Sequence, residues 1–328
     1  MLGTPEERKV ELFRNANVDW LGKKWYFLGF SLIFSVAGVL SLCFWHGLPR
    51  GVDFKGGTEI RVQFAGTPNE EQLRQAVDRG GIRDATIQRI SDPSGRAANM
   101  EVISLPLSTA SDSAHDTGRK QVEDALNAGY HDSAYTIEQV DIVGPTAGKQ
   151  LQKQAALATG YSLIGMLIYL WFRFELIYGV AAVVAVFHDT LITVGAFSLT
   201  NQEISLTVIA AILTLIGYSM NDTIVVFDRI RENLALSRRE SLTDVVNRSI
   251  NQTLSRTVIS SGLTFLTVLS LYLFGGAVLH GFSFALVVGI LIGTYSSIAV
   301  AAPMLVAYQD WRKSQGKVAA LPAKRVRV

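Results

Sequence analysis

The sequence has few charged residues and a single cysteine, and each scarcity excludes a class of protein. Of its 328 residues, 18% are charged and 49% are hydrophobic, which is unusual for a soluble domain of this length. A formal net charge of +2 gives no basis for binding nucleic acid, and no motif supplies one. Cys43 stands alone in an apolar run, so no intramolecular disulfide can form. A membrane protein is therefore the first interpretation.

Long stretches without charge predict six membrane spans. Residues 257–309 contain no Lys, Arg, Asp or Glu, which is enough for two helices with a turn at Gly275 and Gly276. Other apolar runs reach about twenty residues, the length that crosses ~30 Å of hydrocarbon. The spans are expected at about 25–48, 150–172, 176–199, 204–227, 256–274 and 277–308. The pattern predicts a polytopic α-helical membrane protein.

The distribution of Lys and Arg predicts the orientation of these spans. Both residue types are missing from the connections 200–203 and 275–277, but they cluster in the N-terminal segment 1–24 and in the basic tail 310–328. Because Lys and Arg favour the cytoplasmic side, both termini are predicted to be cytoplasmic. A cleaved signal peptide is the alternative for the first span, but bulky Phe44 stands where cleavage sites have small residues.

One region of mixed composition, 49–149, is predicted to form an extracytoplasmic domain between the first two spans. The alternation from Thr58 to Phe64 indicates a strand. Further strands are expected near 85–90, 100–105 and 135–143, and helices near 69–77 and 119–127. This order, β-α-β-β-α-β, is typical of a ferredoxin-like α+β domain.

Two glycine-bearing stretches at the edges of this domain invite comparison with phosphate-binding loops. In the first, Gly144 to Lys149, the glycines are one residue too close, and Gln150 replaces the Ser or Thr that would bind Mg²⁺. It is not a nucleotide loop. In the second, the pair Gly56 and Gly57 leads into a strand, which favours a tight connection between membrane and domain.

Asp222 stands inside the fourth predicted span, where a carboxylate costs ~2.5 to 3.5 kcal/mol on insertion scales. Its helix is predicted to carry a stripe of small and polar residues, namely Thr207, Ala211, Thr214, Tyr218, Asn221 and Asp222. Arg256 begins the fifth span at the same boundary, so an ion pair between Asp222 and Arg256 is geometrically reasonable. The alternative is that Arg256 extends to lipid headgroups and Asp222 is a neutral structural acid.

His188 and Asp189 are adjacent near the middle of the third predicted span. A titratable histidine beside an acid at this depth suits a proton relay. Adjacent residues project about 100° apart on a helix, so both side chains cannot face one seam equally well. The alternative is that one of them satisfies a backbone carbonyl or a nearby threonine. His280, beside the outer turn, is expected at the membrane interface.

Small residues recur at every fourth position of the sixth span and include the GxxxG pair Gly289 and Gly293. This pattern predicts close packing against another helix. The sequence has no HExxH, no GxSxG and no ATP-binding motif, so neither enzymatic activity nor a metal or other cofactor is expected.

Four motifs, in this order, resemble the SecF family of bacterial protein-export membrane proteins, part of the SecD/SecF family in the RND-like superfamily. They are GVDFKGGTEI after the first span, VFHDTLITVGAFSL in the third, GYSMNDTIVVFDRIREN in the fourth and NQTLSRTVISS at the start of the fifth. The resemblance extends over roughly Trp20 to Tyr308 and implies the same six-span layout with one large external domain.

The resemblance implies an accessory subunit of the Sec translocase in the bacterial plasma (inner) membrane. Such a subunit acts with SecD beside the SecYEG channel and uses the proton gradient to promote preprotein translocation. Its partners would then be SecD, SecYEG, the translocating preprotein, protons and membrane lipid, with no nucleic acid.

The resemblance also implies roles for residues at matching positions. The acid of the NDT motif and the arginine of the SRT motif belong to the family's proton path. Together with the candidates found from their depth, the residues that we assign to this path are Asp222, Arg256, Asn221, Asp189 and His188. The residues that fall in the family's first motif are Asp53, Gly56 and Gly57.

Two other functions compete with this interpretation. An RND-type pump for small molecules or lipids usually has large external loops in two places, whereas the later outer connections here are a few residues long. A non-transporting scaffold for the translocon would tolerate the substitution Asp222→Asn, and a proton-coupled protein would not.

Overall fold

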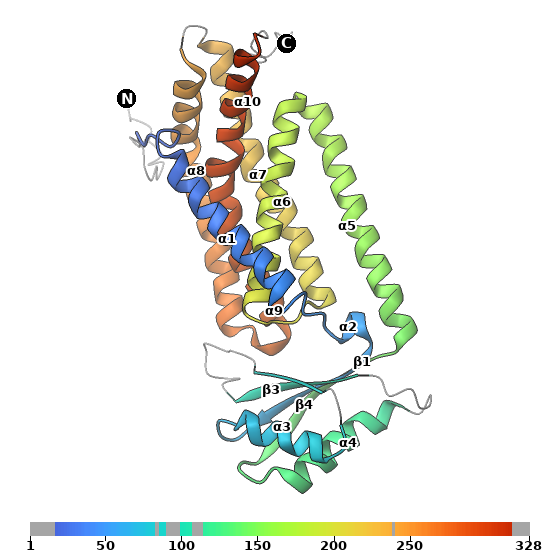
Figure 1. Ribbon diagram of the computed structural model, residues 1–328. Helices are drawn as coiled ribbons and strands as arrows, with labels where there is room; N and C mark the ends of the chain where they lie inside the picture. Colours follow the sequence, from blue (N-terminus) through green and yellow to red (C-terminus); the bar gives the residue numbers. More distant parts are fainter. Residues whose placement is uncertain (1–16, 83–84, 90–98, 107–113, 238–239, 317–328) are drawn as a thin grey trace, which may run out of the picture.

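The structure is a computed structural model that describes residues 17–82, 85–89, 99–106, 114–237 and 240–316. Within these ranges, six helices are long and apolar enough to cross a membrane. They form a bundle with a small sheet domain, residues 57–143, at one end (Figure 1). The predicted fold class, a polytopic helical membrane protein with a ferredoxin-like domain between the first two spans, is confirmed.

The sheet domain has the predicted order of strands and helices. Its elements are β1 (Gly57–Phe64), α3 (Glu70–Arg79), β2 (Thr86–Arg89), β3 (Met100–Pro106), α4 (Ala114–Gly129) and β4 (Tyr135–Val143). The strands lie in the order β2-β3-β1-β4, every neighbouring pair is antiparallel, and α3 and α4 cover one face of the sheet (Figure 1). This is the ferredoxin-like arrangement.

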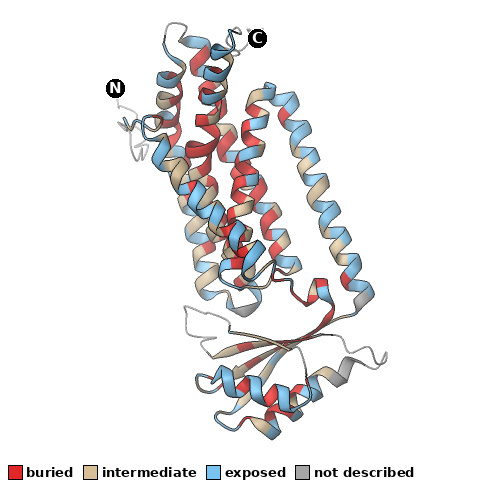
Figure 2. Ribbon diagram, viewed as in Figure 1, coloured by how far each residue is buried: buried red, intermediate tan, exposed pale blue. Residues whose placement is uncertain are grey.

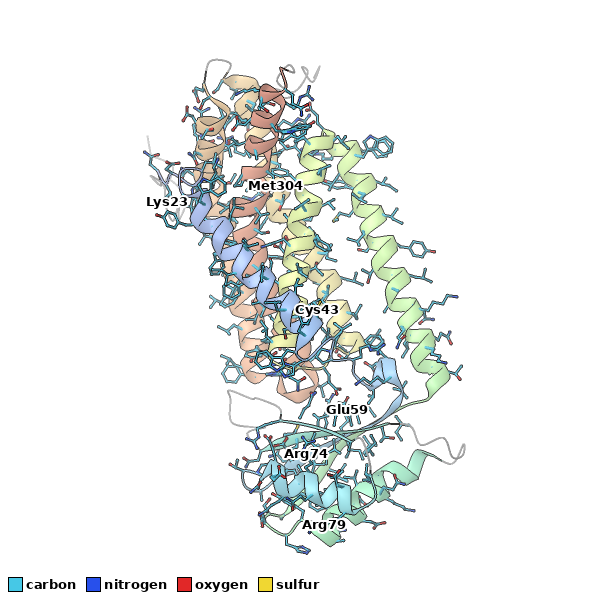
Figure 3. The ribbon with its side chains drawn as sticks, in the orientation of Figure 1. Lys23, Cys43, Glu59, Arg74, Arg79 and Met304 are labelled. Atoms are coloured by element: carbon cyan, nitrogen blue, oxygen red, sulfur yellow. The ribbon has the colours of Figure 1, made fainter. Side chains whose placement is uncertain are left out.

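Alternation along β1 separates the two faces of the sheet. Ile60 and Phe64 are buried in the core that β1 shares with α3 and α4. Glu59 and Arg61 project from the opposite face because successive residues of a strand point to opposite sides. Figure 3 shows Glu59 between the sheet and the ends of the membrane helices, while Arg79 of α3 lies on the far side. The sheet therefore turns a polar face toward the bundle.

The helix bundle has a packed centre and one helix that stands apart. Its long helices are α1 (Lys24–Phe44), α5 (Pro145–Arg173), α6 (Leu176–Leu199), α7 (Leu206–Leu236), α8 (Leu242–Phe274) and α9 (Gly276–Ser296). The buried residues concentrate where α6, α7, α8 and α9 pack together (Figure 2). In contrast, α5 is exposed along nearly its whole length and touches the bundle mainly at its end beside α6 (Figures 1 and 2).

Two helices run beyond the predicted spans 204–227 and 256–274. The polar end of α7 and the polar start of α8 pack against each other through buried Ile230 and Val245. A buried hydrogen bond joins them, since Asn233 Nδ2 donates to Ser249 Oγ at 2.8 Å. Hydropathy identifies only the part of a helix that suits hydrocarbon, whereas the buried residues of these extensions continue the core of the bundle.

The sixth span is interrupted by a π-helical turn. The turn η1 (Ser297–Ala301) separates α9 from α10 (Ala302–Ser314). Pro303 lacks an N–H group, so it cannot donate to the carbonyl group of Ala299 as an α-helix requires. A wider turn before this proline accommodates the missing hydrogen bond, and such turns are frequent at functional sites.

The chain enters the sheet domain through α2 (Val52–Lys55), a single helical turn that the sequence did not predict. Gly56 and Gly57 follow it with φ values of 75° and 145°, which only glycine adopts readily. The start of α1 and the end of α10 both lie at the end of the bundle far from the sheet domain (Figure 1). The predicted orientation used the basic segments 1–24 and 310–328, of which residues 1–16 and 317–328 lie outside the described residues.

Candidate functional site

Two carboxylates lie inside the helix bundle. Asp189 of α6 is 1% exposed and Asp222 of α7 is 2% exposed. Their helices pack together and against α9. Burial of a charged group at this depth is costly unless donors surround it, so the partners of each carboxylate decide what it can do.

Asp189 is held by three side-chain donors from three helices. His188 Nδ1 lies 2.9 Å from Oδ1 of Asp189, so the adjacent residues on α6 contact each other directly. The hydroxyl groups of Ser219 on α7 and Ser296 on α9 donate to Oδ2 at 2.5 and 2.8 Å. Asp189 thus connects α6, α7 and α9, just before the π-helical turn. The other ring nitrogen of His188, Nε2, is buried and has no partner among the described residues.

Asp222 has a sparser environment. Ser261 Oγ of α8 donates to Asp222 Oδ2 at 2.7 Å. The hydroxyl group of Thr294 on α9 lies beside the same carboxyl group. Within the described part of the chain, Thr294 Oγ1 forms no hydrogen bond, and neither does buried Thr257 Oγ1, one turn before Ser261 on α8. Hydroxyl groups of this kind commonly bind water, so the surroundings of Asp222 suit a hydrated carboxylate.

The expected ion pair between Asp222 and Arg256 is not formed in this conformation. Both residues are described, yet no nitrogen of Arg256 lies within 4.0 Å of the Asp222 carboxylate. Arg256 is exposed, whereas Asp222 is buried. The reason is helical geometry, because Arg256 precedes Ser261 by five residues, about 7.5 Å along the axis and about 140° around it. Ser261 occupies the position on α8 that faces the acid.

The predicted polar stripe on α7 is divided between two faces. Ala211 and Asp222 are buried, while Thr207, Thr214 and Asn221 are exposed. Asn221 is adjacent to Asp222 in sequence, so the two side chains project about 100° apart. α7 therefore presents an exposed row of polar residues in addition to its buried acid, which is unusual for a surface that only lipid covers.

Gly289 and Gly293 lie where α9 crosses α7. A Cβ atom at Gly289 would stand 2.4 Å from a side-chain carbon of Leu215, and one at Gly293 would stand 3.0 Å from Cβ of Ser219. Gly293 thus makes room for the serine that donates to Asp189. A second close approach, between Gly38 of α1 and Gly195 of α6, was not predicted from the sequence.

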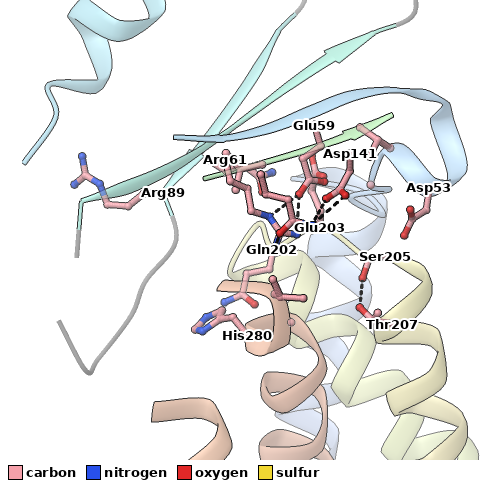
Figure 4. A pocket seen from close by; sticks show the side chains of 17 residues that line it. Asp53, Glu59, Arg61, Arg89, Asp141, Gln202, Glu203, Ser205, Thr207 and His280 are labelled. Atoms are coloured by element: carbon pink, nitrogen blue, oxygen red, sulfur yellow. Dashed lines mark hydrogen bonds and ion pairs between the residues drawn. The ribbon is translucent and has the colours of Figure 1, made fainter. Parts of the chain in front are cut away.

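In addition to the surroundings of Asp189 and Asp222, the structure has a polar cavity between the sheet domain and the bundle. The cavity has a volume of about 300 Å³. It is lined by acids and bases from both sides, among them Asp53, Glu59, Arg61, Asp141, Glu203 and His280 (Figure 4). Arg61 forms an ion pair with Glu59 at 3.0 Å. The ring of His280 lies 4.7 Å from the ring of Tyr272 and is buried, so it faces this cavity as well as the outer turn.

Glu203, in the connection between α6 and α7, is the most perturbed acid of this cavity. Burial, and then the negative charge of Glu59, raise the pKa of Glu203 to about 7, against an opposing effect of Lys55. Burial also raises the pKa of Glu59, and its pairing with Arg61 opposes the shift. Glu203 therefore changes its charge near neutral pH.

Sequence reasoning missed the hydroxyl groups that hold the two buried acids, namely Ser219, Ser261 and Ser296. Serine is common in membrane helices and packs as a small residue, so its presence alone gave no signal. Glu203 was missed as well. The only sequence feature that could have pointed to Glu203 is its position as an acid in a short connection that contains no Lys or Arg.

Comparison with known proteins decides the family. Residues 121–311 match the family described as protein export membrane protein SecD/SecF, C-terminal, and residues 46–67 match the SecD/SecF GG motif. The chain belongs to the SecD/SecF family. The GG motif match contains Gly56 and Gly57, the two glycines with positive φ. The resemblance inferred from four sequence motifs is thus confirmed.

Individual relatives agree with this SecD/SecF membership. A protein translocase subunit SecF from Koribacter versatilis is 52% identical, and the match covers 95% of this chain and 96% of that protein. A protein translocase subunit SecF from Calditerrivibrio nitroreducens is 43% identical over 93% of this chain and 98% of its own length. The crystal structure of SecDF from Thermus thermophilus, a translocon-associated membrane protein, has 36% identity and a TM-score of 0.79. That match covers 90% of this chain and 39% of the SecDF chain.

Proposed function

We propose that this chain is an accessory subunit of the Sec protein translocase that acts with SecD and uses the proton gradient to promote preprotein translocation across the bacterial plasma membrane. Membership of the SecD/SecF family and the names of the relatives support the translocase role. The observation that carries the use of protons is Asp222, a buried carboxylate with one direct hydrogen-bond donor and unsatisfied hydroxyl groups nearby.

The chemistry of this site suits a group that gains and loses a proton. An ionised Asp222 attracts the guanidinium group of Arg256, whose flexible side chain starts less than two turns from Ser261 on α8. A protonated Asp222 loses that attraction and keeps its hydrogen bond to Ser261. The two states therefore favour different positions of α8 relative to α7. Each charge that crosses the membrane supplies ~2.3 kcal/mol per 100 mV, so the gradient is energetically sufficient to drive such a change.

Asp189 and His188 are assigned to the same path in a supporting role. Both oxygen atoms of Asp189 accept hydrogen bonds, and the free Nε2 of His188 is the atom that could exchange a proton there. The partner SecD would cover the exposed polar row of α7 that includes Asn221 and would complete the path. In this arrangement both termini are cytoplasmic, and the sheet domain, on the opposite side, meets a preprotein that leaves the SecYEG channel.

Gradient-dependent translocation into inverted vesicles that contain the whole export complex tests the proposal. We expect Asp222→Asn and Arg256→Ala to abolish the stimulation by the proton gradient, at least tenfold, while the complex remains assembled. The matched control is Asp228→Asn on the same helix, because Asp228 is an exposed acid that pairs with Arg173. This control should translocate as wild type does.

Full gradient stimulation in Asp222→Asn would instead indicate a scaffold that holds the translocon without moving protons. A pump for small molecules or lipids is disfavoured by the outer connections of the bundle. The α6–α7 connection runs from Thr200 to Ser205, and α8 meets α9 at Gly275, so neither leaves room for a second large domain.

A further inference from the structure

Asp53, in the turn α2, binds the start of α7. Its Oδ2 accepts a hydrogen bond from the backbone N–H group of Leu206 at 2.8 Å. Leu206 is the first residue of α7, and the N–H groups of a first helical turn have no acceptor inside their own helix. Ser205 satisfies only one of them, that of Val208, at 3.3 Å. A carboxylate at this position is stabilised both by the hydrogen bond and by the helix dipole.

Two backbone hydrogen bonds reinforce this contact. Gly51 N donates to Ile204 O at 3.0 Å, and Ile204 N donates to Pro49 O at 2.7 Å. They form an isolated parallel bridge between Arg50 and Ile204. We call the two segments that meet here, residues 49–53 and 204–206, the junction. It joins the entrance of the sheet domain to the α6–α7 connection, more than 150 residues away in sequence.

The same turn is fixed to the sheet domain and to α5. Gly56 and Gly57 pass directly from α2 into β1. On the other side, Gln152 Nε2 of α5 donates to Phe54 O at 2.7 Å. A Cβ atom at Gly148 of α5 would stand 3.2 Å from Phe54 O, so α5 and α2 touch through their backbones. The first turn of α7 is therefore connected to β1 through a short segment that is held by hydrogen bonds on both sides.

We propose that Asp53 is a positioning residue that attaches the sheet domain to the start of α7, so that the domain moves with the helix that carries Asp222. The inference rests on the proposed function and adds to it the route by which a change at Asp222 reaches the other side of the membrane. Leu206 and Asp222 are sixteen residues apart on one continuous helix, about 24 Å along its axis. Asp53 acts on the helix end and does not touch the proton.

Hydrogen exchange in the assembled complex tests the contact itself. In Asp53→Ala, the Leu206 amide should exchange about tenfold faster than in wild type, since a helix loses a capping carboxylate. Asp53→Asn should show a smaller increase because its amide oxygen still accepts a hydrogen bond. Asp78→Ala is the matched control, an exposed acid on α3 of the same domain, and should leave Leu206 unchanged. Unchanged exchange in Asp53→Ala would overturn the attachment.

Rescue by a disulfide tests whether translocation requires the sheet domain to be attached to the start of α7. The pair Arg50→Cys and Ile204→Cys, in a Cys43→Ser background, places thiols on bridge partners whose spacing suits a disulfide. We expect Asp53→Ala to reduce gradient-stimulated translocation at least fivefold, the oxidised disulfide to restore it, and a reductant to remove the rescue. Normal translocation in Asp53→Ala, or an oxidised form that stays inactive, would overturn the role of the junction.

Asp222→Asn separates this inference from the proposed function. In that variant the Leu206 amide should exchange as in wild type while translocation is lost. Translocation at the wild-type level in Asp222→Asn would contradict the proton-driven function, and the exchange rate of Leu206 in Asp53→Ala would still decide whether the junction is held by Asp53.

Discussion

Asp189 and Asp222 are both buried in the centre of the bundle, but they are held differently. Asp189 receives hydrogen bonds from three side chains and joins three helices. Asp222 receives one, and the hydroxyl group of Thr294 beside it is unsatisfied within the described residues. Protonation of a carboxylate that accepts several hydrogen bonds disturbs those bonds, so such a group resists protonation. A carboxylate with few partners can accept a proton at little structural cost. Burial alone therefore does not distinguish the two acids, whereas their hydrogen-bond partners do.

Removal of Asp189 should cause the largest loss of stability. In Asp189→Ala, the hydroxyl group of Ser219 and the ring of His188 lose their acceptor inside the bundle, and Ser296 keeps only a long hydrogen bond to Gly293 O at 3.4 Å. We expect the free energy of unfolding to fall by about 3 kcal/mol, measured by denaturation in mixed micelles. Asp222→Ala removes an acid with one direct donor and should cost about 1 kcal/mol. Equal losses in the two variants would contradict the distinction.

Glu203 extends the comparison to an acid outside the membrane spans. Its pKa of about 7 in the folded protein lies above the ordinary value of 4.5. The protonated form is therefore favoured by folding, and the resulting stabilisation is complete below about pH 4.5 and is lost as the pH rises through about 7. We expect roughly 2 kcal/mol of stability at the junction to disappear between pH 5 and pH 8.

Hydrogen exchange of the Gly51 and Ile204 amides measures this effect. The matched variant is Glu203→Gln, which should make their exchange independent of pH over that window after correction for the intrinsic rate. A wild-type junction that becomes more protected as the pH rises would reverse the sign and refute the assignment to Glu203.

The smallest expected effects come from single hydroxyl groups. Ser296→Ala and Ser261→Ala each remove one hydrogen bond inside a membrane bundle, which costs about 0.6 kcal/mol on average. Because Ser261 is the direct donor to Asp222, Ser261→Ala should also shift the pH dependence of gradient-stimulated translocation, whereas Ser296→Ala should leave that dependence unchanged. If both variants show the same pH profile, the proposed difference between Asp222 and Asp189 is contradicted.

Most of the fold followed from sequence because its signals are local. Charge-free runs located the helices, and alternation in β1 separated its buried face, Ile60 and Phe64, from Glu59 and Arg61. The helix ends were harder to predict, since the extensions of α7 and α8 depend on a contact between polar segments. The turn α2 was missed because four residues give no periodic signal.

The sequence was sufficient to predict the two buried acids of the site but not the side chains that form hydrogen bonds with them. An aspartate in an apolar run is visible because it is rare, so Asp189 and Asp222 stood out. Which side chain faces each acid depends on how neighbouring helices are rotated and how far they are shifted along their axes. Arg256 and Ser261 are about 140° and about 7.5 Å apart on α8, so the rotation and axial position of that helix decide which of them meets Asp222, and sequence spacing alone does not contain that information.

The wide turn at 297–301 has a consequence for everything that follows it in the chain. One extra residue in a helix rotates the part that follows it by about 100°. The side of α10 that faces the bundle is therefore determined by the extra residue in the π-helical turn and not by a regular continuation of α9. Deletion of one residue there would turn α10 by about 100° relative to α9, while Pro303 would still lack the N–H group that a regular α-helix requires. Leu305 and Gln309, which now face inward, would then swing toward the bilayer. The carboxyl-terminal helix owes its orientation to a single extra position.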